Sequence, residues 1–172
     1  MIVMFDTSVL VQALKSEFEG ETADFEQAKR DDSRALLRGT SEAWVASVTA
    51  FEMEFARGEP ITFETIPFDG FAATTAAAMA REHIELACPK CWSPTAATIC
   101  PSCGSQGSRW KKMNDIYIAA SAVAFAAQQN DQLVLYAYDN RFQRYLSRFK
   151  SVEVREPPES NPLLSTSTRR KR

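Results

Sequence analysis

Four acidic residues stand where their carboxylates could meet in the folded chain. Asp6 and Asp139 each follow a short apolar run that predicts a buried strand, and Asp115 begins a long apolar helix. Glu52 lies on the helix expected after another predicted strand. Each acid alone has an ordinary explanation, as a helix cap, a charge favoured by the helix dipole or a solvated charge. Together they predict a hard-oxygen site for Mg²⁺ or Mn²⁺, because clustered carboxylates repel one another unless a cation neutralises them.

The four cysteines form a second group with ligand chemistry. They occur as two Cys-x-x-Cys pairs separated by eight residues, Cys88 with Cys91 and Cys100 with Cys103. Four thiolates in paired turns are a ligand set of tetrahedral Zn²⁺. We therefore expect an inserted zinc ribbon or a pair of zinc knuckles over residues 88–107. An iron–sulfur cluster, a redox dithiol and disulfides are the alternatives.

Basic and aromatic residues flank this insert, which directly precedes Asp115. Lys90 and Trp92 lie within it. Two roles fit: the insert orders a long loop, or it recognises RNA through phosphate contacts and stacking rings. For the second role, we expect RNA contacts from the segment after the insert and from a later helix, at Arg109, Trp110, Lys111, Lys112 and Arg141. The position next to Asp115 predicts that the insert overhangs the acidic site.

Composition limits the class of protein. The chain has 172 residues, enough for one domain with an insert and a tail, and 45% of them are hydrophobic, which is enough for a core. The net charge of −2 excludes a basic footprint over the whole domain, so nucleic acid would be held by local patches or bound cations. Because there is no long apolar run and no signal-peptide pattern, we expect a cytoplasmic protein without a membrane partner.

Strands that alternate with helices must position these residues. Strands are expected at residues 2–5, 44–48, 61–68, 132–138 and 151–155. Helices are expected at residues 9–18, 21–37, 49–57, 70–87, 114–129 and 141–150. This alternation predicts an α/β sandwich with a central parallel sheet, in which ligands gather at the carboxyl ends of the strands. Residues 156–172 are rich in proline, serine and threonine and predict a disordered tail.

Four stretches in order, MIVMFDTSVL, SVTAFEMEFARG, MNDIYIAASAVAF and LVLYAYDNRF, resemble the PIN-domain ribonucleases, most closely the VapC-like toxins of bacterial toxin–antitoxin pairs. The resemblance implies a PIN-like α/β/α sandwich over residues 1–155 and metal-dependent cleavage of RNA. It places the family's acidic quartet on Asp6, Glu52, Asp115 and Asp139, and its small hydroxyl on Ser8 or Thr7. It also implies a small antitoxin as partner, and homodimers are common in the family.

The chain departs from the family pattern at three points. Glu54 has the family's usual spacing from Gly58, although the match through Thr49 favours Glu52. Ala137 stands where the family often has threonine, which removes a polar contact near the fourth acid. The cysteine insert lies inside the domain, whereas PIN endonucleases that mature ribosomal RNA carry a zinc ribbon after it.

The leading hypothesis is an endoribonuclease of the toxin type, in which divalent metal activates a water that attacks the phosphodiester. A ribosomal RNA processing endonuclease is one alternative. A non-catalytic RNA-binding module that uses the zinc insert is the other.

Overall fold

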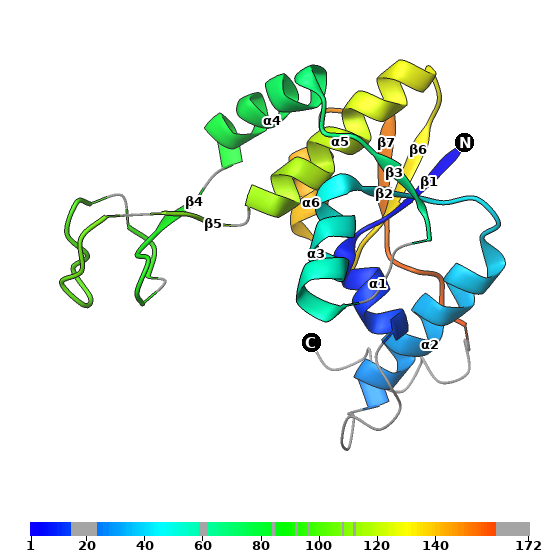
Figure 1. The fold of residues 1–172 in the computed structure, drawn as a ribbon, viewed down its shortest axis with the longest axis horizontal. Coiled ribbons are helices and arrows are strands. Elements are labelled where there is room, and N and C mark those ends of the chain that lie inside the picture. Colours follow the sequence, from blue (N-terminus) through cyan, green and yellow to red (C-terminus); the bar gives the residue numbers. More distant parts are fainter. Residues whose placement is uncertain are drawn as a thin grey trace.

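Five parallel strands form the centre of the molecule (Figure 1). The computed structural model describes residues 1–14, 24–58, 62–83, 85–91, 93–95, 97–107, 109–111 and 113–160. The central sheet has the order β3-β2-β1-β6-β7, with β1 paired to β2 on one side and to β6 on the other. Its strands are β1 (Ile2–Phe5), β2 (Trp44–Ala46), β3 (Glu64–Ile66), β6 (Leu133–Tyr136) and β7 (Val152–Arg155). The prediction of an α/β protein with a central parallel sheet is confirmed.

Six helices accompany this sheet in the described part of the chain. They are α1 (Thr7–Leu14), α2 (Asp24–Gly39), α3 (Ser47–Arg57), α4 (Gly70–His83), α5 (Met113–Gln129) and α6 (Arg141–Leu146). The first strand shows why both faces are covered, because side chains alternate along a strand. Met4 packs in a core with α4, α5 and α6, while Phe5 packs in a second core with α1 and α3. Both side chains are fully buried.

Helix α5 is the most deeply buried helix of the fold. Ten of its residues, between Ile116 and Ala126, are buried, and most of them are alanine or β-branched. Small side chains let α5 lie close to the sheet and to α4, whose Ala72, Ala76 and Met79 face inward. The N-terminus of α5 is thereby held near the carboxyl ends of the strands, which places Asp115 at the candidate site.

The cysteine insert is carried on a hairpin of its own. Strand β4 (Glu85–Ala87) pairs antiparallel with β5 (Arg109–Lys111). The predicted helix over 70–87 is therefore wrong at its end: α4 stops at His83, and residues 85–87 become a strand because their backbone pairs with the chain that returns from the insert. Figure 1 shows the hairpin and insert projecting sideways from the ends of α4 and α5, so the insert extends away from the sheet and does not overhang it.

Other element boundaries differ from the sequence predictions by a few residues. Helix α3 begins at Ser47, so the strand expected to reach residue 48 ends at Ala46. Helix α6 ends at Leu146, short of the expected residue 150. Within the expected tail, Pro157 is buried and the backbone N–H of Ser160 donates to Asp32 Oδ1 at 2.6 Å. Residues 161–172 lie outside the described residues.

Candidate active site and cysteine cluster

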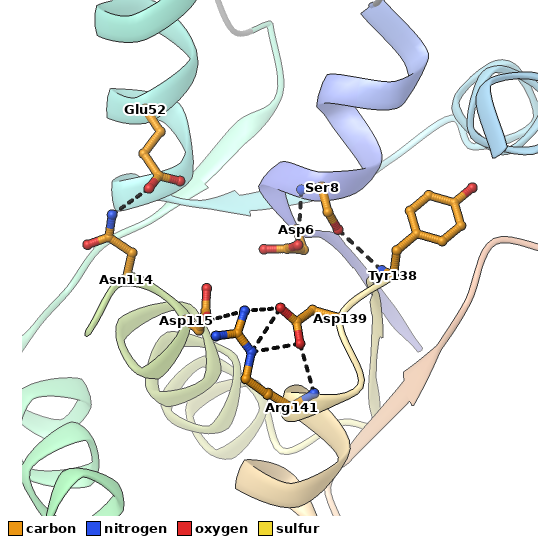
Figure 2. A network of polar contacts seen from close by, with 8 residues as sticks. All are labelled: Asp6, Ser8, Glu52, Asn114, Asp115, Tyr138, Asp139 and Arg141. Carbon is orange, nitrogen blue, oxygen red and sulfur yellow. Dashed lines mark hydrogen bonds and ion pairs between the residues drawn. The ribbon is translucent and has the colours of Figure 1, made fainter. Parts of the chain in front are cut away.

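The four predicted acids come from four segments of the chain and lie at one edge of the sheet (Figure 2). Asp6 follows β1, and Asp139 lies three residues after the neighbouring strand β6. Glu52 lies on α3, which follows β2, and Asp115 lies in the first turn of α5. Figure 2 shows their carboxylates arranged around a common space. The parallel sheet explains the positions of Asp6, Glu52 and Asp139, because the carboxyl ends of its strands all lie at one edge. The packing of α5 brings Asp115 to them.

Asp6 is the most buried of the four acids. Only 4% of its surface is exposed, and the backbone N–H of Ser8 donates a hydrogen bond of 3.0 Å to its Oδ2. Burial raises the pKa of Asp6 above its ordinary value, with a smaller contribution from the negative charge of Glu52, while the hydrogen bonds from Ser8 act in the opposite direction. A buried carboxylate beside a second acid is a group that a cation would stabilise.

Glu52 is held by side chains from two other elements. The hydroxyl of Thr7 donates to its Oε2 at 2.6 Å, and the amide of Asn114 donates to its Oε1. The hydroxyl of buried Thr49 lies 3.4 Å from that of Thr7. Glu54, two residues further along α3, is exposed. The geometry therefore brings Glu52, and not Glu54, to the other acids.

Arg141 lies between two of the acids. Its Nε donates to Oδ1 of Asp139 at 2.8 Å, and its Nη2 lies 3.0 Å from Oδ2 of Asp115 and also pairs with Asp139. Hydrogen bonding to Asp139 raises the pKa of Arg141 further above its usual range, so the guanidinium is always charged. In the structure Arg141 is the counter-charge of Asp115 and Asp139, and its expected contact with RNA stays a prediction.

The two predicted hydroxyl residues have different contacts. Thr7 binds Glu52, as described, whereas the Oγ of Ser8 accepts a hydrogen bond of 3.2 Å from the backbone N–H of Tyr138. Ser8 thus ties the start of α1 to the loop that carries Asp139. The site roles of Asn114 and Thr49 were missed in the sequence. The available signal was position alone: Asn114 directly precedes Asp115, and Thr49 lies three residues before Glu52, on the same face of a helix.

A pocket of about 560 Å³ adjoins the acids on the side of α1 and α2. Its lining combines hydroxyl, amide, carboxylate and ammonium groups with one aliphatic side chain and one aromatic ring, contributed by Thr7, Ser8, Val11, Gln12, Lys29, Tyr138, Asp139 and Asn140. Asp139 and Ser8 belong both to this pocket and to the acidic site.

The four cysteine sulfurs form a compact cluster. All four lie within 4.8 Å of one another, with Cys88 3.5 Å from Cys103 and Cys91 3.6 Å from Cys100. Tetrahedral zinc with Zn–S bonds of about 2.3 Å requires sulfur–sulfur distances of about 3.8 Å. All four cysteines are free thiols, so no disulfide accounts for the short distances between their sulfurs. The cluster could therefore bind a metal such as zinc.

The two Cys-x-x-Cys turns have the same backbone geometry. In each turn the N–H of the first cysteine donates at 2.9 Å to the carbonyl of a serine five residues later, from Cys88 to Ser93 and from Cys100 to Ser105. Each serine hydroxyl lies next to the second cysteine of its turn, at 3.3 Å for Cys91 and 2.9 Å for Cys103. The insert thus contains two cysteine turns with matching hydrogen bonds.

Hydrogen bonds lower the pKa of one thiol of this cluster, that of Cys88. The backbone N–H of Cys91 and the hydroxyl of Ser105 lower the pKa of Cys88 to about 5. The thiolate, which is the form that binds metal, therefore predominates at neutral pH. Burial acts in the opposite sense on Cys100 and raises its pKa.

Comparison with models of known protein families, with curated proteins and with solved structures found no match for this chain. In the searched part of the structure, no helix is long and apolar enough to cross a membrane.

The acids and the cysteines differ in how closely their ligand atoms approach. Among the described residues, the cysteine cluster is the one group of three or more metal-ligating side chains whose ligand atoms all lie within 4.8 Å. The acids surround a wider space, into which Arg141 brings a guanidinium (Figure 2).

The remaining predicted RNA contacts lie on the hairpin after the insert. The backbone of Arg109, Trp110 and Lys111 forms β5, but their side chains lie outside the described part of the structure, as do Trp92 and Lys112 entirely. Strand β5 leads into α5, so these positions adjoin Asp115 along the chain.

Proposed function

We propose that this protein is a divalent-metal-dependent endoribonuclease with a PIN-like fold. One observation carries the proposal: Asp6, Glu52, Asp115 and Asp139, on four separate segments, gather at the carboxyl ends of adjacent parallel strands. The order of the four motifs in the chain and their resemblance to PIN-domain ribonucleases support the same conclusion.

The donor set fits Mg²⁺ or Mn²⁺. Carboxylate oxygens are the ligands that these hard cations prefer, and the described site contains no cysteine or histidine to select a softer metal. Asp6, Asp115 and Asp139 would hold the cation, with Glu52 as a further ligand. When bound, it supplies a water of lowered pKa and neutralises charge on the phosphodiester.

The neighbouring side chains keep these carboxylates in position. Thr7 and Asn114 hold the two oxygens of Glu52 toward the site, and the backbone N–H of Ser8 fixes Asp6. Arg141 neutralises Asp115 and Asp139, which would otherwise repel each other in the metal-free protein. Displacement of the guanidinium would free both carboxylates and would present a cation to the RNA phosphate.

One alternative function has an observation in its favour. Because Arg141 already supplies a cation to Asp115 and Asp139, the chain could keep this arrangement and bind RNA without cleaving it. Such a module would use the insert and the basic β5 segment for binding. The two functions differ in whether a divalent metal enters the site.

The insert is assigned to Zn²⁺, as a structural site with a closed set of four thiolates. Since the insert extends away from the sheet, we assign it first to ordering the long connection between α4 and α5. RNA recognition by β5 would be an additional role.

The biological setting follows from the resemblance. A cytoplasmic toxin that is held inactive by a small antitoxin is the proposed role. Two stacked rings on α3, Phe51 and Phe55, are exposed at 62% and 81%, and such an apolar surface is one that a protein partner would cover. Homodimer formation is proposed on the resemblance alone.

The test is metal-dependent RNA cleavage by the whole protein. A 5′-labelled single-stranded RNA is incubated with Mg²⁺ or Mn²⁺ and with wild-type protein, Asp115→Asn or the surface control Glu42→Gln. We expect Asp115→Asn to lose roughly a hundredfold or more in rate, because an amide binds a hard cation poorly, and Glu42→Gln to retain full activity. Equal rates for wild type and Asp115→Asn would refute the site, and binding without cleavage would favour the alternative.

A further inference from the structure

The pocket beside the acids is an open depression with the volume of a small-ligand site. Its volume of about 560 Å³ lies within the range of ligand pockets in proteins. Its lining includes Asp139 and Ser8, which also belong to the acidic site, and Gln12 and Lys29, which lie on α1 and α2. A ligand that reaches the acids could therefore continue directly into this pocket.

Gln12 lines this pocket and carries an acceptor without a partner among the described residues. Its Nε2 donates to Oε2 of Glu26 at 3.1 Å. A carboxylate only accepts hydrogen bonds, so this contact fixes which end of the amide faces Glu26. The other end, Oε1, has no hydrogen-bond partner within the described residues and less than 1 Å² of accessible surface, so a ligand reaches it only when the side chain turns toward the pocket. A buried acceptor without a partner is costly, and a ligand that donates a hydrogen bond would remove the cost.

Lys29 brings a positioned cation to the same pocket. Its ammonium lies 5.2 Å from the centre of the Tyr138 ring and 4.0 Å from Oε1 of Glu26. Tyr138 is itself immobilised, since its hydroxyl donates to the backbone carbonyl of Lys29 at 2.8 Å and lies 2.9 Å from Ser33 Oγ. The ring and the glutamate thus hold the ammonium at the pocket wall, where an anion could meet it.

We propose that this pocket binds one nucleotide of the RNA substrate, the one that flanks the cleaved phosphodiester on the α1–α2 side. Gln12 Oε1 accepts a hydrogen bond from an N–H group of the base, and Lys29 contacts the nucleotide's phosphate. Unpaired RNA is recognised in this way, through base edges and phosphates of splayed nucleotides. The proposal rests on the proposed function, because that function places an RNA phosphodiester at the acids.

The test measures binding separately from cleavage. Fluorescence anisotropy follows a labelled single-stranded RNA of about twelve nucleotides, which is within the usual site size for single strands. Full-length protein is used in buffer without Mg²⁺ or Mn²⁺, and affinity is measured over a salt series of about 50 to 200 mM. The variants are Lys29→Gln and Gln12→Met, with the exposed Lys150→Gln as matched control, and thermal melting checks that each is folded.

The two variants should give different signatures. Lys29→Gln should lower the slope of log K against log salt by about 0.7 and weaken binding about fivefold near 0.1 M salt, because one phosphate contact is lost. Gln12→Met should weaken binding roughly two- to tenfold with an unchanged slope, because a neutral hydrogen bond is lost. Lys150→Gln should match wild type. If Gln12→Met fails to fold, the salt slope of Lys29→Gln still shows whether the pocket contacts a phosphate.

The outcomes separate this proposal from the nuclease itself. The nucleotide pocket would be overturned if both variants bound RNA with the affinity and salt slope of wild type. This is also the result expected if the pocket serves a protein partner. A wild-type protein that binds no RNA would overturn the nucleotide pocket as well. The nuclease would stand in either case if wild type cleaves RNA and Asp115→Asn does not. The expected signatures in a protein without metal-dependent cleavage would support the pocket and refute the nuclease.

Discussion

The guanidinium of Arg141 binds the carboxylate of Asp139 along its edge, with Nε 2.8 Å from Oδ1 and 3.0 Å from Oδ2. The backbone N–H of Arg141, the first residue of α6, donates to the same Oδ1 at 3.0 Å. Because Arg141 reaches Asp115 as well, one side chain neutralises two of the four acids.

This relationship predicts that Arg141 competes with divalent metal. Arg141→Gln should increase Mn²⁺ affinity about fivefold, because a partly exposed ion pair of this kind contributes roughly 1 kcal/mol, which the metal no longer has to displace. Isothermal titration calorimetry without RNA measures the affinity. Arg144→Gln, an exposed arginine on the same helix, serves as control and should leave the affinity unchanged. An unaltered affinity in Arg141→Gln would mean that Mn²⁺ does not use Asp115 and Asp139.

The second prediction separates the two glutamates of α3. Glu52→Gln should reduce the RNA cleavage rate by roughly ten- to hundredfold, because a charged acceptor that Thr7 and Asn114 hold toward the site is lost. Glu54→Gln should retain nearly the wild-type rate, because Glu54 is exposed. Single-turnover cleavage under Mg²⁺ compares the two. The opposite ranking would show that Glu54 is the acid that serves the site.

The third prediction uses the raised pKa of Asp6. The Asp6 carboxyl keeps its proton to higher pH in the folded protein than in the unfolded chain. The stability that protonated Asp6 contributes is therefore lost as the pH rises from 3.8 through the raised pKa of the folded protein. Each unit by which the pKa of Asp6 is raised lowers the free energy of unfolding by about 1.4 kcal/mol at neutral pH. In metal-free protein, Asp6→Asn should therefore be more stable than wild type at pH 7, while its RNA cleavage is lost.

Thermal melts over pH 4 to 8 would measure this difference, which should grow as the pH rises. A wild type that gains stability relative to Asp6→Asn over the same range would show that the Asp6 carboxylate is favoured by folding. Added Mn²⁺ should stabilise wild type and leave Asp6→Asn nearly unchanged, because a ligand that binds the native state stabilises it by mass action.

Local patterns in the sequence were enough to place much of the fold. The apolar run before Asp6 and the one before Asp139 mark buried strands, and a parallel sheet brings the ends of such strands together. Strand β4 could not be predicted in this way, since Glu85–Ala87 is made extended by pairing with Arg109–Lys111, more than twenty residues away. Pattern within one segment contains no information on such a partner.

Local patterns likewise predict one part of the candidate site and not the other. Asp6, Asp115 and Asp139 were predicted because each stands at a recognisable end of a strand or helix, and Glu52 because it lies on the helix after a predicted strand. The pairing of Arg141 with Asp115 depends on how α5 and α6 pack, and the orientation of Gln12 depends on Glu26 across two helices. These contacts are tertiary, and residue type and spacing do not specify them.

The last prediction concerns zinc in the insert. Purified protein should contain about one Zn²⁺ per chain after dialysis against a weak chelator, because structural zinc is bound with about 10–16 kcal/mol in small fingers. Cys88→Ser with Cys91→Ser should remove the metal and make the insert sensitive to protease, while the parallel sheet survives, since no strand of that sheet lies in the insert. Ser105→Ala is the milder variant: it should still bind one zinc, but more weakly, because Cys88 and Cys103 lose the hydroxyl beside them. Elemental analysis and limited proteolysis measure both effects. Metal-free wild-type protein, or a disulfide in protein kept reduced, would exclude the zinc assignment.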